Sequence, residues 1–261
     1  MPVARAGVPR WIMGRATHGY KLSTIELGLH AIADFLPDRH MLADADVVCA
    51  LRAAAKYPSS VRRQKQPILM SLLRDLVPCL PAYWRQARDF AFWLLAWYGM
   101  FRGAELVSLS WDDVAVRSEG LVLFVARSKT DQAGQGQAVY VHRSDDEILC
   151  PLRAVIRLAE FCPEDVPLQG PLFPVHCGAD AAVSKRTMLG RLHEALRCLG
   201  EPSQLFGLHS LRSGGATAAC AAGVSERMIK VHGRWVSDVV RLYMCALPSD
   251  RWAVSSAMQS R

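Results

Sequence analysis

The sequence predicts a mainly α-helical protein with one small antiparallel β-sheet, an α+β fold. Apolar residues recur at helical spacing over most of the 261 residues, as they do on the buried faces of amphipathic helices. In the middle of the chain this spacing gives way to two short β-like stretches, at 121–126 and 138–141, on either side of a segment rich in Gly, Gln and Asp. A polar and basic stretch at 58–67 separates a short helical module from a larger domain.

The first sixty residues carry the short module. Residues 1–20 are rich in Pro, Gly and Arg, and we expect them to be poorly ordered. Two helices are predicted in residues 21–60. One lies in "STIELGLHAIADFL", with Ser23 as a candidate N-cap, and the other in "DADVVCALRAAAKY", after Asp44. The polar stretch "PSSVRRQKQP" that follows indicates a linker.

From Ile68 onward the pattern predicts the larger domain, which we place at 61–250, with 251–261 as a C-terminal tail. The expected helices cover about 68–80, 84–101, 103–109, 151–162, 184–199, 210–222, 224–230 and 236–246. The most apolar run, "FAFWLLAWYGMF", is too short to span a bilayer and predicts a buried core helix. We therefore expect no membrane contact.

The net charge of the chain indicates the kind of partner it binds, and its cysteines indicate the compartment. The formal net charge is +7, and a basic excess favours a polyanionic partner such as nucleic acid. Arg62, Arg63 and Lys65 lie in the linker, where they are either solvated or in contact with phosphates. The eight cysteines show no C-x-x-C spacing, so we expect neither a metal site nor a disulfide framework. Scattered thiols indicate a reducing, intracellular compartment.

Two stretches in the middle of the chain carry polar residues in an apolar background. In "YGMFRGAELVSL", Arg102 and Glu105 are three residues apart and share a helix face. If they have no functional role, the two residues form an ordinary ion pair at the end of the helix. In "ARSKTDQAG", Lys129 lies where the first strand runs into the turn, a place where lysines are commonly only solvated.

Two further stretches lie nearer the C-terminus. In "GLHSLRSGGAT", His209 and Arg212 open a helix whose N-terminus favours anions, and a Gly-Gly pair allows close backbone approach. In "VHGRWVSDVVRLYM", Trp235 precedes Tyr243 by eight residues. Each aromatic alone is more commonly a core residue. The order Arg, Lys, His-x-x-Arg, Trp, Tyr favours a single site instead.

In this order, the four stretches resemble the boxes of the tyrosine recombinase (phage integrase-like) family of DNA strand-exchange enzymes, over roughly residues 60–250. The wording "GRW-x-S-D" is most similar to integrases of crypton-like and DIRS-type mobile elements. The resemblance implies a tyrosine recombinase catalytic domain preceded by a core-binding module, a DNA clamp, that is reduced here to residues 21–60. Members usually have four or more helices in that module.

The resemblance also implies an activity. It is site-specific recombination or integration of a mobile element, by DNA breakage and rejoining through a covalent 3′-phosphotyrosyl intermediate. The implied partner is double-stranded DNA, bound as a dimer or tetramer without metal or cofactor, and in the nucleus if the host is eukaryotic. Two alternatives stay open: a catalytically inactive, integrase-derived DNA-binding protein, and a type IB topoisomerase-like enzyme.

The residue roles follow from the same resemblance. Tyr243 is the nucleophile, Arg102 and Arg212 hold the non-bridging oxygens, and Lys129 protonates the departing 5′-oxygen. His209 binds the phosphate or helps to accept the tyrosine proton.

Three further roles complete the implied site. Trp235 takes a position that is His in many members and binds the phosphate through its indole N–H, and we prefer it to His232 for that position. Glu105 orients the arginine and histidine groups. Arg62, Arg63 and Lys65 contact DNA.

Overall fold

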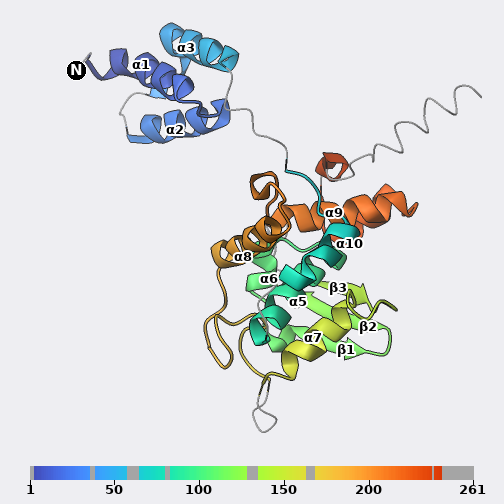
Figure 1. Ribbon diagram of the computed structural model, residues 1–261. Coiled ribbons are helices and arrows are strands. Elements are labelled where there is room, and N and C mark those ends of the chain that lie inside the picture. Colours follow the sequence, from blue (N-terminus) through green and yellow to red (C-terminus); the bar gives the residue numbers. More distant parts are fainter. Residues whose placement is uncertain are drawn as a thin grey trace, which may run out of the picture. The chain divides into compact units, whose positions relative to one another are not determined.

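The protein is described by a computed structural model that covers residues 3–35, 39–57, 65–79, 83–127, 135–162, 168–236 and 238–242 (Figure 1). The chain divides into two compact units, Met1–Gln64 and Lys65–Arg261. We call them unit 1 and unit 2. Each has a hydrophobic core formed from its own residues. Within the described ranges, no helix is both long enough and apolar enough to cross a bilayer.

The described residues of unit 1 form three α-helices. They are α1 (Val3–Thr17), α2 (Leu22–Phe35) and α3 (Ala45–Lys56), with the 3-10 helix η1 (Arg39–Ala43) before α3. Their buried residues recur mostly every four positions, which places them on one face of each helix: Val8, Ile12 and Ala16 on α1, Ile25, Leu29 and Ala33 on α2, and Val47, Ala50 and Ala54 on α3. α2 and α3 are the two helices predicted in residues 21–60, and α1 is an additional helix within residues 1–20.

The expectation of poor order in residues 1–20 is wrong. These residues contain α1, which packs against α3. The helix was missed because Gly7, Pro9 and Gly14 all disfavour helix interiors, whereas burial of Ile12 outweighs that cost here.

The predicted start of α3 is confirmed, and the predicted N-cap of α2 is not. α3 begins after Asp44, whose carboxylate accepts a hydrogen bond from the backbone N–H of Asp46 at 2.9 Å. The proposed Ser23 N-cap is wrong, because Ser23 lies inside α2. The backbone N–H of Ile25 already donates to the carbonyl of Lys21.

Unit 2 is mainly helical with one three-stranded sheet. Its α-helices are α4 (Met70–Asp75), α5 (Trp84–Tyr98), α6 (Gly103–Val107), α7 (Pro151–Ala159), α8 (Lys185–Cys198), α9 (Leu208–Ala221) and α10 (Glu226–Gly233). Its 3-10 helices are η2 (Val77–Cys79), η3 (Trp111–Asp113), η4 (Ser203–Leu205) and η5 (Asp238–Leu242). The helices predicted between 68 and 230 are found close to their expected positions.

The helix α5 forms the centre of unit 2. Residues 90–97 are all buried, as predicted from the run "FAFWLLAWYGMF". It contacts α6, α7 and α9, and α7 also contacts the sheet (Figure 1). A helix that is apolar on all sides must be surrounded by other elements, and α5 is. Its C-terminal end leads directly to Arg102.

The sheet has the order β1-β2-β3, with both pairs antiparallel. Its strands are β1 (Val114–Arg117), β2 (Gly120–Val125) and β3 (Gln137–His142). β2 and β3 match the two predicted strands, and Leu121 pairs with Val141 and Leu123 with Val139 on the buried face. The sequence did not predict β1, because none of its four residues is fully buried and its alternation is weak.

The predicted linker 58–67 is shorter at its C-terminal end. The backbone N–H of Gln66 donates to the carbonyl of Leu205 at 2.8 Å, and Lys65 Nζ donates to the carbonyl of Gln204 at 2.5 Å. Residues 65–67 therefore belong to unit 2. The predicted DNA contacts Arg62 and Arg63 lie outside the described residues.

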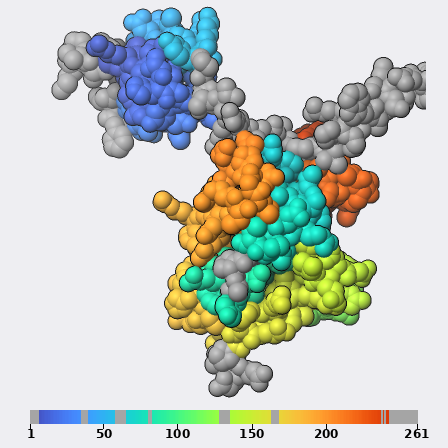
Figure 2. All heavy atoms as spheres, viewed as in Figure 1, coloured from blue at the N-terminus to red at the C-terminus, as the bar shows by residue number. Residues whose placement is uncertain are grey.

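The surface of unit 2 brings distant segments together. η2 contacts α8, and on the face shown in Figure 2 a teal part of the chain lies beside the orange part that includes α8. More than a hundred residues of chain separate them.

Candidate active site

Arg102 and Glu105 form the ion pair that their spacing predicts. Arg102 is the N-cap residue of α6, and Glu105 is the third residue of that helix. Arg102 Nη1 lies 2.6 Å from Glu105 Oε1, and the backbone N–H of Arg102 donates to Glu105 Oε2 at 2.9 Å. The arginine side chain is 17% exposed and the glutamate side chain 2%. A ligand can therefore reach Arg102 but not Glu105.

Glu105 also binds Arg234, a residue that the sequence did not single out. Arg234 Nη2 donates to Glu105 Oε2 at 2.9 Å, and both residues are buried. Burial by itself raises the pKa of Glu105. The charge of Arg234 and the hydrogen bonds from Arg102 and Arg234 outweigh burial and hold the pKa below its usual value. The one sequence signal for Arg234 was a charged residue beside Trp235.

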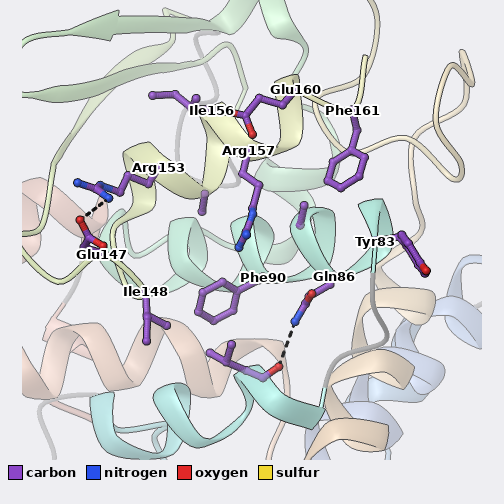
Figure 3. A pocket seen from close by; sticks show the side chains of 13 residues that line it. Tyr83, Gln86, Phe90, Glu147, Ile148, Arg153, Ile156, Arg157, Glu160 and Phe161 are labelled. Carbon is purple, nitrogen blue, oxygen red and sulfur yellow. Dashed lines mark hydrogen bonds and ion pairs between the residues drawn. The ribbon is translucent and has the colours of Figure 1, made fainter. Parts of the chain in front are cut away.

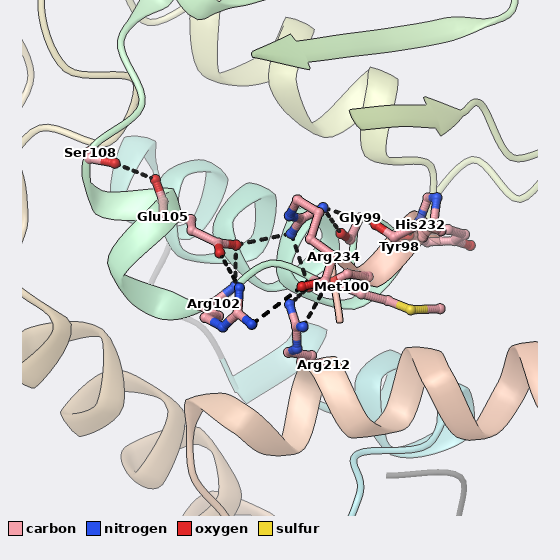
Figure 4. A network of polar contacts seen from close by, with 10 residues as sticks. Tyr98, Gly99, Met100, Arg102, Glu105, Ser108, Arg212, His232 and Arg234 are labelled. Atoms are coloured by element: carbon pink, nitrogen blue, oxygen red, sulfur yellow. Dashed lines mark hydrogen bonds and ion pairs between the residues drawn. The ribbon is translucent and has the colours of Figure 1, made fainter. Parts of the chain in front are cut away.

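Arg212 lies in α9 and reaches the same place. Its Nη1 and Nη2 donate to the carbonyl oxygens of Met100 and Gly233, the latter at 2.5 Å. Its Cζ lies 3.9 Å from the centroid of the Trp235 ring, which is a cation–π geometry. Figure 4 shows Arg102 and Arg212 pointing toward the same segment around Met100, and Trp235 packs on Arg212.

The carbonyl oxygen of Met100 is shared by two of these side chains. It accepts from Arg212 Nη1 and from Arg234 Nη2, the latter at 3.1 Å. Met100 and Arg234 have φ values of 46° and 58°, and such left-handed backbone costs about 1–3 kcal/mol per non-glycine residue. The surrounding contacts hold this strained geometry in place.

The Gly-Gly pair in α9 serves helix packing. A Cβ on Gly214 would lie 1.9 Å from the carbonyl oxygen of Ile68, and one on Gly215 would lie 2.1 Å from that of Trp97. Close backbone approach was predicted, and it takes place between α9 and the chain around α5. This packing brings Arg212 next to the end of α5.

The other predicted residues are placed only in part. His209 is the second residue of α9 and is exposed, one helical turn before Arg212. Lys129 and Tyr243 lie outside the described residues. The predicted helix 236–246 is described only in part, as η5.

The 3-10 helix η5 ends one residue before Tyr243. Its Val240 is fully buried in a small core that Met100, Ala216, Ile229 and Trp235 complete. Two ion pairs join η5 to α10: Lys230 with Asp238, and Arg241 with Glu226. The segment before Tyr243 is therefore fixed beside the arginine cluster.

His232 serves the fold of this region. Its Nε2 lies 2.7 Å from the carbonyl oxygen of Tyr98. Burial lowers the pKa of His232; the hydrogen bond to Tyr98 opposes this shift, and the charges of Arg234 and Arg212 add to it. The ring is therefore neutral near pH 7 and donates from Nε2.

The charges of the cluster favour an anion. Two guanidinium groups, those of Arg102 and Arg234, share the Glu105 carboxylate, and that of Arg212 binds the Met100 carbonyl, which Arg234 also binds. Positive charge in a partly buried place needs compensation. A phosphodiester, with two non-bridging oxygens, suits arginine donors.

A cavity of about 760 Å³ opens elsewhere in unit 2, between η2, α5 and α7 (Figure 3). Its lining includes Phe90, Ile148 and Phe161 beside the cationic Arg153 and Arg157. None of the predicted catalytic residues lines it. It is therefore separate from the arginine cluster.

Comparison with known proteins shows similarity in sequence to one recombinase. No protein-family model matches the chain. The chain is 28% identical over 211 residues to the "Integrase/recombinase xerD homolog" of Selenomonas ruminantium. The match covers 80% of this chain, which spans about 62% of the length of that curated relative.

Solved structures show the same fold. XerH site-specific recombinase, bound to a palindromic difH substrate in a post-cleavage complex, matches with a TM-score of 0.60 at 13% identity, over 94% of this chain and 67% of that one. A lambda integrase dimer bound to a COC′ core site matches with a TM-score of 0.60 at 19% identity, over 95% of this chain and 65% of that one. This chain therefore has the fold of the tyrosine recombinases and integrases, and it is similar in sequence to an integrase/recombinase.

Proposed function

We propose that the protein breaks and rejoins DNA strands through a covalent 3′-phosphotyrosyl intermediate, as a tyrosine site-specific recombinase. The observation that carries this proposal is the arginine cluster. Arg102 and Arg212 converge from α6 and α9, and the cluster lies beside η5, which ends one residue before Tyr243. The fold and the 28% identity to an integrase/recombinase support it.

The chemistry requires a nucleophile and a charge clamp. The Tyr243 oxygen attacks the phosphorus, the new P–O bond forms on the 3′ side, and the bond to the 5′-oxygen breaks. Arg102 and Arg212 hold the two non-bridging oxygens and stabilise the charge that develops there. Lys129 gives a proton to the departing 5′-oxygen. Rejoining reverses these steps, so the energy of the broken bond is kept.

Three residues support this step. His209, exposed at the start of α9, hydrogen-bonds the phosphate or accepts the tyrosine proton. Trp235 contributes its indole N–H, which can donate but cannot act as a base, and its ring packs on Arg212. Glu105 orients Arg102 by its two hydrogen bonds.

Double-stranded DNA is the proposed substrate, and a dimer or tetramer the active assembly. XerH and lambda integrase are described as bound to a DNA substrate and, for the latter, as a dimer on a core site. Residues 21–60, which contain α2 and α3, are the proposed reduced clamp. Arg62, Arg63 and Lys65 are proposed to neutralise phosphates.

The subfamily and the compartment are finer proposals. The sequence "GRWVSD" favours a crypton-like or DIRS-type mobile-element integrase. Such an enzyme acts in the nucleus if the host is eukaryotic. The cysteines within the described residues are free thiols, which supports a reducing, intracellular compartment.

Covalent trapping tests the activity. Nicked duplexes tiled across the DNA that flanks the gene release a short strand on cleavage and leave the tyrosyl adduct trapped. We expect the wild type to form an adduct and Tyr243→Phe to form none, with DNA affinity unchanged. Tyr83→Phe is the matched control, because Tyr83 is 80% exposed in the same unit, and it should form the adduct normally.

The alternatives give other results. A wild type that binds these duplexes and never forms an adduct is an integrase-derived binding protein, and the proposal is then wrong. A topoisomerase of type IB relaxes supercoiled plasmids as a monomer with no requirement for two sites. A recombinase requires synapsis of two sites to give products.

A further inference from the structure

We propose that Arg234 is a positioning residue for both phosphate-binding arginines. It holds Glu105, and through Glu105 it holds Arg102. The turn that it forms also places Trp235 on Arg212. This inference rests on the proposed function and adds a residue to which the sequence gave no role.

The first link is the guanidinium group of Arg234. Among the described residues it makes four hydrogen bonds, of which two reach the segment between α5 and α6, one reaches Glu105 in α6 and one reaches His232 in α10. Nη1 donates to the carbonyls of His232 at 2.9 Å and Gly99 at 3.3 Å, and Nη2 to the Met100 carbonyl at 3.1 Å and to Glu105 Oε2 at 2.9 Å. Arg234 and Glu105 are 129 positions apart in the sequence.

The second link is the backbone of Arg234. This residue is the C-cap of α10 and has a left-handed conformation, with φ 58° and ψ 46°. Its carbonyl oxygen lies 3.5 Å from Arg102 Nη2. The next residue, Trp235, stacks on Arg212. The position of Arg234 therefore affects both Arg102 and Arg212.

Arg234 acts through these neighbours. Its Nη2 is bound to Glu105, and of the pair Arg102 and Arg234 it is Arg102, the more exposed side chain, that is assigned to the phosphate. The planar guanidinium suits this task because it donates in several fixed directions at once. A lysine ammonium, a compact point charge on a flexible stem, does not reproduce these four bonds.

Loss of Arg234 changes what Glu105 does. The buried carboxylate keeps Arg102 as its cation and loses the second, so Arg102 is held more closely to Glu105 and less well toward a phosphate. Small displacements of this kind slow a reaction by about 10²-fold. DNA affinity comes mainly from other phosphate contacts.

The experiment measures two quantities separately: the single-turnover rate at which the protein cleaves the nicked duplex, and the Kd of the protein for that duplex. We expect Arg234→Met and Arg234→Lys to lower the cleavage rate by about 10²-fold and to change Kd by less than about threefold. The matched control is Arg88→Met. Arg88 is 2% exposed in the same unit and donates to the carbonyls of Pro174 and Val175. The Arg88→Met variant, where folded, should cleave at a rate within about threefold of the wild type.

A double-mutant cycle shows whether Arg234 acts through Glu105. If it does, Arg234→Met combined with Glu105→Gln cleaves no more slowly than the slower single variant. If the two rate losses multiply, to about 10⁴-fold for two losses of about 10²-fold, the link through Glu105 is refuted.

A measurement without DNA separates this inference from the proposed function. The side-chain Nε–H signal of Arg102 in ¹⁵N-arginine-labelled protein should shift in Arg234→Met and stay in place in Arg88→Met. If the wild type never cleaves but this signal shifts, the recombinase proposal is wrong and the positioning role stands. If Arg234→Met alters neither the signal nor the cleavage rate, the positioning role is wrong.

Discussion

At the scale of single residues, the main feature of this protein is a group of buried charged side chains. Arg212, Arg234 and Glu105 are each at most 5% exposed, and ions at such depth cost several kcal/mol each unless they are paired. The structure supplies the pairing through backbone carbonyls, the Trp235 ring and one shared carboxylate. These costly groups are kept together at the place where a phosphate is proposed to bind.

His232 makes the stability of this region depend on pH. Burial lowers the pKa of His232 in the folded protein, whereas in the unfolded chain it lies near its ordinary value of about 6.5. The unfolded state then binds more protons below that value, so the stabilising contribution of the neutral ring is complete above about pH 6.5 and is lost as pH falls toward the folded pKa.

The measurement is the free energy of unfolding by urea between pH 7.5 and pH 5.5. The wild type should lose more stability over this interval than His232→Gln, which keeps an N–H donor and does not titrate. Equal slopes for the two proteins would contradict the assignment.

At the scale of elements, α9 and α5 pack so closely that only glycine fits between them. The hypothetical Cβ atoms on Gly214 and Gly215 would meet backbone oxygens of Ile68 and Trp97, which move only with their whole segments. This contact sets the distance between the end of α5, which leads to Arg102, and Arg212 in α9.

Adding one methyl group to this contact should therefore destabilise the protein. We expect Gly214→Ala and Gly215→Ala each to cost about 1–3 kcal/mol or more, because overpacking displaces backbone. Gly190→Ala in α8 is the control. Its Cβ meets nothing within 4 Å, so it should stabilise the helix by about 0.5–1 kcal/mol. Urea denaturation of the three variants checks both signs.

Local pattern was sufficient for most elements. The apolar run around Trp93 predicts a helix buried on all sides, and the alternation around Leu123 predicts a strand, because each depends on neighbours within a few residues. The helix α1 and the strand β1 were not predicted. Their residues gain burial or pairing only from distant segments, through Ile12 packing in unit 1 and Val116 pairing with Leu121.

At the scale of the whole molecule, each unit has a large core of its own, and unit 2 also has the small core around Val240. Their members do not overlap, so the cores can be tested apart. The arginine cluster lies entirely in unit 2, as does η5. The proposed chemistry is therefore a property of unit 2, and the DNA clamp proposed for the N-terminal module can be tested separately.

The fragment Lys65–Arg261 tests this division. We expect it to unfold cooperatively, because its core is built from its own residues. It lacks Arg62 and Arg63, so the slope of log affinity against log salt should fall in magnitude by about 2 if each contacts one phosphate. Cleavage per bound complex should persist. A fragment with full affinity and an unchanged salt slope would rule out unit 1 and the linker as DNA contacts.

The sequence by itself determined the helix-rich fold class, the order of the four boxes and the spacing that pairs Arg102 with Glu105, since each of these depends on residues close together or on residue type. Only the tertiary structure placed Arg102 beside Arg212 and showed that Arg234 joins them. Glu105 and Arg234 are 129 positions apart, and no local pattern specifies which distant side chains meet. That choice depends on how α5, α9 and α10 pack, which the glycine pair and the buried cores decide.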